Sequence, residues 1–280
     1  MRFGVIGTGR FGLFHCQKYS KLNSLVGIFD VDPIRATQVS KQFGCSQFAS
    51  SDSLLDHVDA VSICTPTTTH FLFARQALTR HTHVFVEKPI ATTVEQAQEL
   101  IDLAAMNNLV LQVGHIERFN ESFTRAENLI IDPITISAIR TCAYNGRCMD
   151  VDVVLDLMIH DLDIIAHYFG EPESIEVEEI MWYPGKLNGV KARLMFPGGR
   201  MAEVEANRAA MMDDRYMSFN FRSEPPIHIN FHQKSNDALM EEVKDFRSSI
   251  DRGSKPKVSG TDGLLALKLA NAIRGKLKNV

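Results

Sequence analysis

The sequence predicts an α/β fold in two parts: an N-terminal doubly wound parallel sheet, then an α+β domain with an open, mostly antiparallel sheet. Three observations support this. A glycine-rich turn links the first apolar run to a helical stretch. Strand-like and helix-like segments then alternate through the first 116 residues, as in parallel sheets with crossover helices. After residue 120 most segments are strand-like, with one long helix among them and two at the end.

Length and composition indicate the number of domains and exclude some classes of partner. A chain of 280 residues is too long for one ordinary core, so we expect two domains, residues 1–116 and 117–280, with the C-terminal helix 261–278 able to pack back on the first. The apolar content of 45% and the charged content of 23% are those of a soluble globular protein. The net charge of −4 and the lack of a Lys/Arg block argue against a nucleic-acid partner, and no apolar run is long enough to suggest a membrane.

The cysteines and the N-terminus bear on location. The first strand begins almost at Met1 and leaves no room for a signal peptide. The cysteines are odd in number, scattered and without a CxxC pair, which indicates reduced thiols. They are Cys16, Cys45, Cys64, Cys142 and Cys148. We therefore expect a cytoplasmic protein.

The first dozen residues, MRFGVIGTGRFG, are the most informative stretch. An apolar run at residues 3–6 meets Gly7-Thr8-Gly9-Arg10-Phe11-Gly12, and a helix follows at about residues 10–22. In a Rossmann fold Gly7 permits the tight turn, Gly9 leaves room for a pyrophosphate against bare backbone, and Gly12 lets helix and strand pack closely. The N–H groups at the start of the helix then offer a partial positive charge to the phosphates.

Asp30 strengthens the dinucleotide interpretation. The second strand, residues 25–29, ends at Asp30, about 20 residues after the glycines, where dinucleotide folds place the carboxylate that binds the ribose 2′-hydroxyl. This carboxylate would repel a 2′-phosphate, so NAD is favoured over NADP, although Arg10 and Arg35 could weaken that preference. The alternative is an ordinary glycine turn with a solvated Asp30.

The rest of the first half continues the alternation. Pro33 opens a helix to residue 43, because proline suits the first helical turn. Thr92 with Glu95 forms a capping box for a helix that ends near residue 107. The other segments are a short helix at 52–57, strands at 60–64, 82–86 and 109–113, and a helix at 67–80.

Chemically distinctive residues follow each of these strands. The carboxyl ends of parallel strands share one edge of a sheet, and ligands bind at that edge. Beyond the glycine turn and Asp30, the residues concerned are Thr65-Pro66, Glu87-Lys88-Pro89 and Gly114-His115. Each could be an ordinary loop by itself, but together they are expected to line one edge.

The second half has a different pattern. Pro197-Gly198-Gly199 indicates a hairpin between two strands, and Gly170 ends a long helix. The expected helices lie at 122–129, 153–169, 237–251 and 261–278, and the strands at 134–140, 174–178, 191–196, 200–207, 216–222 and 227–232. An open sheet leaves one face uncovered, and pairing two such faces is a common way to bury it. We therefore expect a homodimer or homotetramer.

The helix at 153–169 carries candidate catalytic residues. Asp156, His160, Asp163 and His167 recur at spacings of four, three and four, which predicts one polar stripe beside an apolar one. Asp156 can accept a hydrogen bond from His160, which would orient the ring and raise its basicity. One alternative is a surface stripe of helix-stabilising Asp/His pairs.

A metal site is the other alternative for this helix. His160 with Asp156 or Asp163 could bind zinc, but a third ligand would have to come from His70 or His115. We do not expect a metal.

Taken together, these motifs resemble the glucose–fructose oxidoreductase / inositol dehydrogenase / rhizopine catabolism (Gfo/Idh/MocA) family over nearly the whole chain. The resemblance is carried by GTGRFG at 7–12, Asp30, Thr65-Pro66 with His70, Glu87-Lys88-Pro89, GHIERFN at 114–120 and DLMIHDLD at 156–163. The EKP tripeptide after a buried strand and the DxxxH helix are its discriminating marks. The GHxERFN segment is similar to the branch that contains UDP-N-acetylglucosamine 3-dehydrogenases, which oxidise the C3 hydroxyl of that nucleotide sugar.

The resemblance implies an NAD-dependent oxidoreductase acting on CH–OH groups. It implies that Lys88, joined to Pro89 by a cis peptide bond, is the catalytic lysine, and that Asp156 and His160 are the remaining catalytic pair. The implied cofactor-binding residues are Gly7, Thr8, Gly9, Arg10, Phe11, Gly12, Asp30, Thr65, Pro66, His70, Glu87, Lys88 and Pro89. The chain is short for the family, with trimming in the second domain, so the substrate loops and subunit contacts stay open.

Oxidation of a secondary alcohol requires a hydride acceptor, a base for the hydroxyl proton and positive charge near the developing alkoxide. NAD would supply the first, His160 held by Asp156 the second, and Lys88 the third, with a share in the proton transfer. Beside these three residues, the candidates for binding substrate oxygens or a diphosphate are Arg118, Asn120, Tyr144, Asn145 and Arg147. Among them, Arg118 is part of the family motif, whereas the other four rest on position alone, with an ordinary surface loop as the alternative for each.

Other functions remain open at this point. A dehydrogenase of a free sugar or inositol would use the same residues without a nucleotide-binding region. A sensor or scaffold could bind the dinucleotide without catalysis, but it would have no need of Lys88, Asp156 and His160 together. A metal-dependent hydrolase would require the metal site described above.

Overall fold

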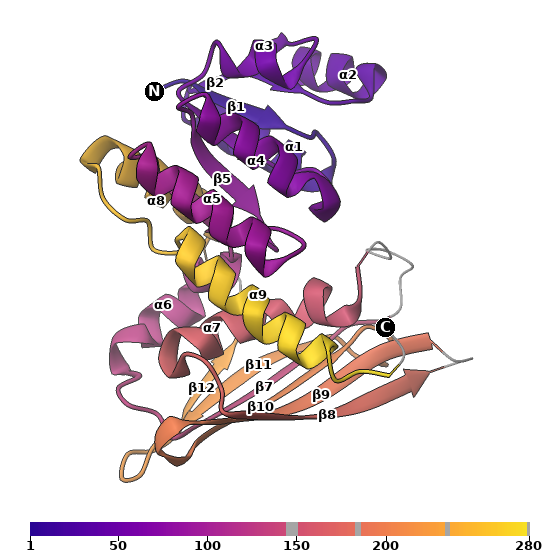
Figure 1. Cartoon of the computed structure of the whole chain (residues 1–280), viewed down its shortest axis with the longest axis vertical. Coiled ribbons are helices and arrows are strands. Elements are labelled where there is room, and N and C mark those ends of the chain that lie inside the picture. Colours follow the sequence, from indigo (N-terminus) through magenta and orange to yellow (C-terminus); the bar gives the residue numbers. More distant parts are fainter. Residues whose placement is uncertain (144–150, 183–185, 233–235, 279–280) are drawn as a thin grey trace. The chain divides into compact units, whose positions relative to one another are not determined.

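The structure, a computed structural model, describes residues 1–143, 151–182, 186–232 and 236–278 (Figure 1). Its internal contacts divide the chain into two units. Unit 1 comprises Met1–His115 and Leu239–Leu264, and unit 2 comprises Ile116–Ala238 and Leu265–Val280. The chain thus returns to unit 1 near its end, in contrast to the continuous second domain expected from the sequence.

Unit 1 is built on a parallel sheet with the strand order β3-β2-β1-β4-β5-β6. Helices lie on both sides of the strands (Figure 1), and β1, β4 and β6 are buried along their whole length. The doubly wound sheet predicted from the sequence is therefore confirmed. Its strands are β1 (Phe3–Ile6), β2 (Leu25–Phe29), β3 (Ser46–Gln47), β4 (Ala60–Ile63), β5 (His83–Glu87) and β6 (Leu111–Gly114). Its helices are α1 (Arg10–Lys21), α2 (Pro33–Phe43), α3 (Ser51–Leu55), α4 (His70–Thr79), α5 (Val94–Met106) and α8 (Ala238–Arg252).

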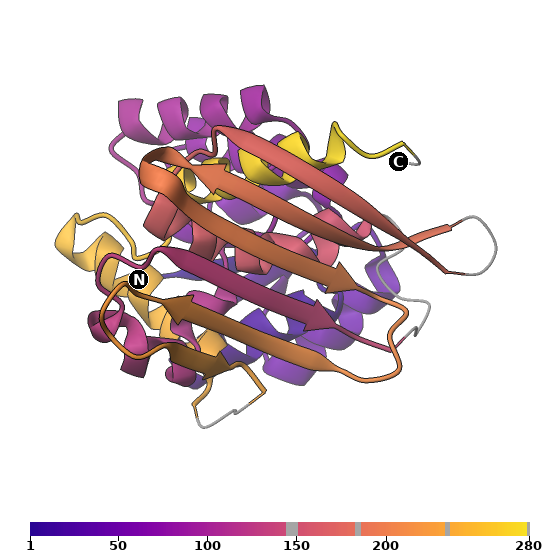
Figure 2. The ribbon, with the colours of Figure 1, turned by 90° about the horizontal axis from the view of Figure 1, so that it is seen from below.

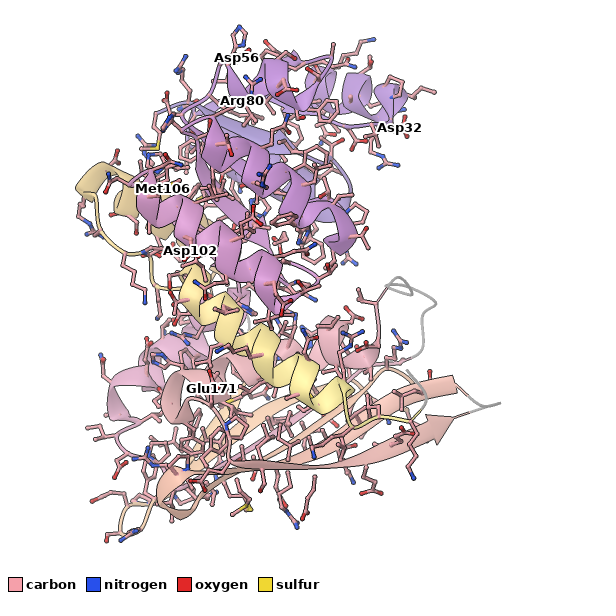
Figure 3. The ribbon with its side chains drawn as sticks, viewed as in Figure 1. Asp32, Asp56, Arg80, Asp102, Met106 and Glu171 are labelled. Atoms are coloured by element: carbon pink, nitrogen blue, oxygen red, sulfur yellow. The ribbon has the colours of Figure 1, made fainter. Side chains whose placement is uncertain are left out.

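Local capping fixes where these helices begin. Asp32, labelled in Figure 3, accepts hydrogen bonds from the backbone N–H groups of Ile34 and Arg35 at the start of α2. At the start of α5 the cap is Thr93, whose hydroxyl accepts from the backbone N–H of Gln96. The predicted capping box of Thr92 and Glu95 is therefore wrong by one residue, because the first helical turn begins one position later.

Helix α8 brings the chain back into the core of unit 1. Phe246 of α8 is fully buried, with its ring 6.0 Å from that of Phe3 and 5.8 Å from that of Phe85. Phe3 in turn stacks on Tyr19 of α1 at 4.5 Å. Aromatic pairs at these separations contribute packing beyond their buried area. This cluster explains why residues 239–264 fold with the first unit although they follow the second in sequence.

Unit 2 is built on a second sheet with the order β12-β11-β7-β10-β9-β8 (Figure 2). Among the described strands every neighbouring pair is antiparallel except β7 and β10, so the sheet is mostly antiparallel as predicted. The hairpin between β9 and β10 turns through Pro197–Gly199. The strands are β7 (Thr135–Thr141), β8 (Ser174–Trp182), β9 (Lys186–Phe196), β10 (Arg200–Asn207), β11 (Asp214–Asn220) and β12 (Ile227–Asn230), and the helices are α6 (Glu121–Ala126), α7 (Ile159–Phe169) and α9 (Gly260–Arg274), within which the unit boundary falls.

The two faces of this second sheet differ. Helix α7 and the helical segment before it pack against β7 and β10, and residues such as Ala138, Leu194 and Val204 are buried beneath them. On the opposite face, Figure 2 shows the strands with no described element of unit 2 in front of them. Side chains of β7, β8, β9 and β10, Lys191 and Glu203 among them, line an open groove of about 510 Å³ on that face.

Unit 1 has ion pairs on its surface, and the described cysteines of the chain are free thiols. Arg80 after α4 pairs with Asp52 and Asp56, at 2.7 Å each, and so ties α3 to α4 (Figure 3). The cysteines within the described ranges are free thiols, and Cys148 lies outside those ranges. No helix in the described parts of the chain is both long and apolar enough to cross a bilayer.

Candidate active site

The glycine turn has the three properties that a bound pyrophosphate requires. Gly7 has a φ of +84°, and a Cβ there would lie 2.8 Å from the side chain of Thr65. A Cβ on Gly12 would lie 1.9 Å from the carbonyl oxygen of Gly7, so α1 packs on the turn without room for a side chain. Gly9, by contrast, has no atom within 4 Å of its hypothetical Cβ, and α1 begins directly after it without a side-chain cap. The fold does not itself require glycine at position 9, whereas a phosphate lying against bare backbone and the first helical N–H groups would.

Asp30 ties the end of β2 to this turn. One carboxylate oxygen accepts hydrogen bonds from the backbone N–H of Thr8 at 2.6 Å and from its hydroxyl at 2.8 Å, and the other accepts from the N–H of Asp32 at 2.9 Å. Burial alone would raise the pKa of this carboxyl, but the hydrogen bonds from Asp32 and Thr8, with Arg35 nearby, outweigh burial and lower it. Asp30 is therefore ionised at neutral pH, as a ribose-binding carboxylate must be. Arg35 lies 3.8 Å from Asp30 and is half-exposed.

The segment Glu87-Lys88-Pro89 follows β5, and the Lys88–Pro89 peptide bond is cis, as the family resemblance implied. The Glu87 carboxylate lies 2.9 Å from Nε2 of His15 in α1. The Pro89 carbonyl lies 2.8 Å from Nδ1 of His70, whose Nε2 lies 2.8 Å from the carbonyl of Thr65. Both residues next to Lys88 are thus held by histidines.

His70 has a different environment from the one expected of a cofactor ligand. It is 1% exposed, and both ring nitrogens face backbone carbonyls. Burial lowers the pKa of His70, while the two carbonyls act in the opposite direction. This geometry favours a role inside the protein over direct contact with a dinucleotide.

The predicted strand-end residues of unit 1 do gather at one sheet edge. The glycine turn, Asp30, Thr65-Pro66, Glu87–Pro89 and Gly114-His115 follow β1, β2, β4, β5 and β6, which are neighbours in the sheet. Two close approaches confirm the grouping: Thr65 against Gly7, and Glu87 against Gly114, where a Cβ would lie 2.9 Å from a carboxylate oxygen. Arg10 and Phe11 are exposed at the start of α1, and Thr8 is buried.

In unit 2 the DxxxH pair lies where the helix changes its winding. Residues Val154–Met158 form a π-helical segment that continues into α7, instead of the uniform α-helix expected over 153–169. The Asp152 carboxylate accepts hydrogen bonds from the N–H groups of Val154 and Leu155 and fixes the start of the segment. Asp156 lies within the π segment and His160 in the first turn of α7, and both are partly exposed. Single π turns are common at functional sites.

The side chains of the predicted polar stripe differ in exposure. Asp163 is 2% exposed, while His167 is exposed. Asp163 lies 3.8 Å from the guanidinium of Arg118, and another nitrogen of Arg118 lies 3.1 Å from Nδ1 of His167. Of the four side chains, Asp163 is therefore buried against Arg118, while Asp156, His160 and His167 are partly or fully accessible.

Arg118 and Asn120 are predicted to contact substrate, and the structure buries both, at 2% and 7% exposed. Asn120 caps α6 by accepting from the N–H of Ser122, and its amide donates to the carbonyl of Phe231 and to the carboxylate of Glu117. These contacts within unit 2 favour a positioning role for both residues. Tyr144, Asn145 and Arg147, the other substrate candidates, lie outside the described residues.

A buried ion-pair network lies beneath α7, and it was not predicted from the sequence. Arg140 of β7 is 3% exposed and donates to both carboxylate oxygens of Asp161 at 2.8 Å, and to Glu117 at 2.8 Å. Burial would lower the pKa of Arg140, but the two carboxylates raise it, so the guanidinium stays charged. The sequence signal that could have indicated this network is Asp161, a charged residue on a helix whose neighbouring positions are mostly apolar.

Side chains that could bind a metal ion also lie close together in unit 1. Among the residues described, the group that could hold an ion is His15, Cys64 and Glu87, whose ligand atoms lie within 4.8 Å of one another. It differs from the set predicted around His160. His15 and Glu87 already face each other at hydrogen-bond distance.

Comparison with known proteins agrees with this geometry. A family model described as "Oxidoreductase family, NAD-binding Rossmann fold" matches residues 1–115. UDP-N-acetylglucosamine 3-dehydrogenase of Acidithiobacillus ferrooxidans is 33% identical over 303 residues, covering 98% of this chain and 96% of that protein. Myo-inositol 2-dehydrogenase of Thermotoga maritima is 25% identical, covering 99% and 96%. The solved structure of the A. ferrooxidans enzyme, GnnA, has a TM-score of 0.95 at 32% identity and covers 99% of this chain and 97% of its own.

These similarities and the geometry of the glycine turn lead to one assignment. The residues of unit 1 fit an NAD-binding Rossmann domain, with a glycine turn after β1 and an ionised Asp30 at the end of β2. The relatives named as dehydrogenases align along the full chain and not only with this domain. The chain therefore belongs to the Gfo/Idh/MocA family of NAD-binding oxidoreductases that act on hydroxyl groups.

Proposed function

We propose that this enzyme oxidises the C3 hydroxyl of UDP-N-acetylglucosamine to the keto sugar with NAD. The observation that carries the proposal is the 33% identity to a UDP-N-acetylglucosamine 3-dehydrogenase over 98% of the chain. Similarity of that length includes unit 2, which supplies His160 and Asp156. The GHIERFN segment at the start of unit 2, similar to that branch of the family, supports the same substrate.

The proposed chemistry divides between a few side chains. NAD, when bound, accepts the hydride at its nicotinamide ring. Lys88 supplies positive charge to the oxygen of the reacting hydroxyl as negative charge develops there. His160 accepts the hydroxyl proton, and Asp156, one helical turn earlier, favours the ring orientation and charge that proton transfer needs.

The residues proposed to hold the cofactor are those whose geometry fits it. The backbone around Gly9 and the first N–H groups of α1 would bind the pyrophosphate. Asp30 would accept from the ribose hydroxyl at the oxygen that bonds to Asp32, since that oxygen accepts one hydrogen bond while the other already accepts two from Thr8. An ionised Asp30 also disfavours a 2′-phosphate and hence NADP.

A substrate panel tests the proposal. Purified enzyme with NAD is mixed separately with UDP-N-acetylglucosamine, free N-acetylglucosamine and myo-inositol, and NADH formation is followed by its absorbance. We expect turnover with UDP-N-acetylglucosamine and little with the other two, and mass spectrometry of the product two mass units below the substrate. Turnover of myo-inositol with none of the nucleotide sugar would refute the substrate assignment and leave the oxidoreductase class intact.

A free-polyol substrate is the second candidate. Several inositol 2-dehydrogenases align along nearly the whole chain at 24–26% identity. Their reaction requires the same acceptor, base and positive charge, so the residues proposed here would serve it equally. A non-catalytic dinucleotide sensor is the candidate of another class, and NADH bound without turnover of any hydroxylated compound would favour it.

A further inference from the structure

Lys88 lies between two residues that are each held by a histidine from a helix elsewhere in unit 1. The residue before it, Glu87, contacts His15 of α1, and the residue after it, Pro89, contacts His70 at the start of α4. Neither histidine is adjacent to Lys88 in sequence. The residues on both sides of the lysine are therefore held by side chains outside their own loop, Glu87 at its carboxylate and Pro89 at its carbonyl.

His15 holds Glu87 in one orientation. The ring is fully buried and packs edge-on against Phe85 at 4.8 Å, which leaves it little freedom to turn. A carboxylate can only accept, so Nε2 of His15 must donate to Glu87 across 2.9 Å. Nδ1 of His15 has no hydrogen-bond partner within the described ranges. The described hydrogen bond of this ring is therefore the one to Glu87.

The opposite side of Glu87 is fixed by steric contact. Glu87 is paired with Gly114 across β5 and β6. A Cβ on Gly114 would lie 2.9 Å from a carboxylate oxygen of Glu87 and 3.1 Å from its carboxyl carbon. The carboxylate thus fits between His15 and Gly114, where any side chain would press against it.

His70 bridges two loops at the same sheet edge. Its nitrogens each lie 2.8 Å from a carbonyl oxygen, that of Pro89 after β5 and that of Thr65 after β4. A neutral imidazole has one N–H and can donate to only one carbonyl at a time. The contact with Pro89 is the one that bears on Lys88, because it holds the residue that directly follows the lysine.

We propose that His15 and His70 are positioning residues for Lys88, which they hold through Glu87 and Pro89. The inference rests on the proposed function only in that Lys88 is the group whose position matters. An error of about 1 Å in the placement of such a group can cost roughly 100-fold in rate. Two anchors, one on each side of the lysine, would keep its ammonium group in a fixed place.

A hydrogen-bond function accounts for the His15 cluster better than a metal does. His15, Cys64 and Glu87 have ligand atoms within 4.8 Å of one another, but Nε2 of His15 already donates to the Glu87 carboxylate across 2.9 Å. A metal bound at Nε2 would have to replace this hydrogen bond.

Paired substitutions of His70 separate its two contacts. In His70→Asn the amide nitrogen takes the place of Nδ1 and can still donate to Pro89. In His70→Gln the amide nitrogen takes the place of Nε2 and can donate only to Thr65. We expect His70→Gln to lower kcat by about 10- to 100-fold and His70→Asn to lower it much less. A purely structural role would affect both variants alike.

A second pair tests His15. His15→Gln retains a donor toward Glu87, and His15→Leu removes it. We expect His15→Leu to lower kcat and His15→Gln to restore most of the loss. If the His70 variants fail to fold, as judged by thermal melting, this pair decides the question alone.

The decisive readout does not depend on turnover. The acylation rate of Lys88 in the cofactor-free protein is measured by mass spectrometry, relative to exposed Lys21 in the same molecule. We expect the ratio to change several-fold in His70→Gln and His15→Leu, and to stay unchanged in His70→Asn and His15→Gln. His83→Phe is the matched control, because His83 also bonds to backbone, the N–H of Val110, but at the far end of β5.

A double-mutant cycle completes the test. If the histidines act through Lys88, His70→Gln causes no further loss of kcat in a Lys88→Ala background. Additive losses, equal behaviour of the Asn and Gln variants, or unchanged Lys88 labelling in all variants would overturn the inference. Labelling of Lys88 requires no substrate. If the enzyme is inactive toward the proposed sugar, the proposed function is refuted, but the labelling rates still test whether the two histidines position Lys88.

Discussion

The proposed chemistry depends on Lys88 and His160, and the structure supports these two residues in different ways. Lys88 follows a strand end, and its neighbours are held from outside the loop by His15 and His70. His160 is at the first turn of α7, one residue before the buried Asp161. In both cases a partly accessible functional group is attached to backbone that has little freedom.

The first prediction concerns these two side chains. Lys88→Ala and His160→Ala should each lower kcat by about 10²–10⁴, the usual range for the loss of acid–base or electrostatic help, with the Kd for NAD little changed for His160→Ala. Steady-state kinetics with the best substrate of the panel provide the measurement. Lys21→Ala and His228→Ala alter exposed residues elsewhere and serve as controls. A variant with near-normal kcat would remove its residue from the mechanism.

The second prediction concerns cofactor affinity. Asp30→Ala removes an acceptor for the ribose hydroxyl and releases Thr8 of the glycine turn. A hydrogen bond to a charged group contributes about 1.5–3 kcal/mol, so the Kd for NAD should rise roughly 10- to 100-fold. Titration followed by NADH fluorescence measures it, and Asp32→Ala, which disrupts only the cap of α2, is the control. Unchanged affinity would place the ribose elsewhere.

The third prediction is the pH dependence that Asp30 creates. Its folded pKa is lower than the usual value of 3.8, so the unfolded chain binds the proton more tightly. The stabilisation is therefore present above that value and is lost as the pH falls through the folded pKa. In urea unfolding of the cofactor-free protein, the stability difference between wild type and Asp30→Asn should shrink between about pH 6 and about pH 3. A difference that is constant over this range would contradict the prediction.

At the scale of elements, the π segment and α7 carry the proposed catalytic pair, and α7 is fixed to the sheet by charge as well as by apolar packing. Arg140 of β7 donates to both oxygens of Asp161 and also to Glu117. The Asp152 carboxylate accepts hydrogen bonds at the start of the π segment before α7, and it also pairs with Arg274 of α9 at 2.5 Å. Glu171, just after α7, pairs with Lys268 of α9 (Figure 3). Both ends of the helix are thus anchored within unit 2.

The fourth prediction compares a buried ion pair with an exposed one on the same sheet. Arg140→Met leaves Asp161 charged and buried, and should lower the free energy of unfolding by about 3–5 kcal/mol. Arg193→Met on β9 removes an exposed pair with Glu203 and should cost no more than about 1 kcal/mol. Chemical denaturation of both variants measures the difference. Similar losses in the two variants would show that the network under α7 contributes little.

At the scale of the whole molecule, the uncovered face of the second sheet is the feature that the single chain leaves unexplained. Both of the cations that line its groove pair with glutamates within the sheet, Arg193 with Glu203 and Lys191 with Glu205. Ile139 and Tyr216 face each other across β7 and β11 and are 45% and 44% exposed. A face with exposed apolar side chains beside paired charges suits contact with a second copy of itself. We propose that the protein forms a homodimer or homotetramer through this face.

The fifth prediction tests that proposal. Ile139→Arg places an unpaired charge in the middle of the face and should shift the assembly toward the monomer, measured by size-exclusion chromatography with light scattering. Ile131→Arg makes the same change at a residue that is 74% exposed and outside the strands, and should leave the mass unchanged. A wild-type protein that is monomeric at micromolar concentration would refute the proposed contact.

The sequence by itself determined the features that depend on neighbouring residues. The spacing of Gly7, Gly9 and Gly12, the acid at the end of β2 and the alternation of strands and helices predicted the parallel sheet and its binding edge. These signals are local, because a tight turn, a helix start and a strand end each involve only a few consecutive residues. The cis Lys88–Pro89 bond followed from the family motif in the same way.

The tertiary structure decided which distant side chains meet. The sequence did not indicate that His70 faces Pro89, that His15 faces Glu87, or that Arg140 pairs with Asp161. It did not indicate that α8 returns to the first unit through Phe246. A charged or aromatic residue shows its chemistry in the sequence, but its partner is chosen by packing, since burial makes an unpaired polar group costly and brings together residues that the chain separates.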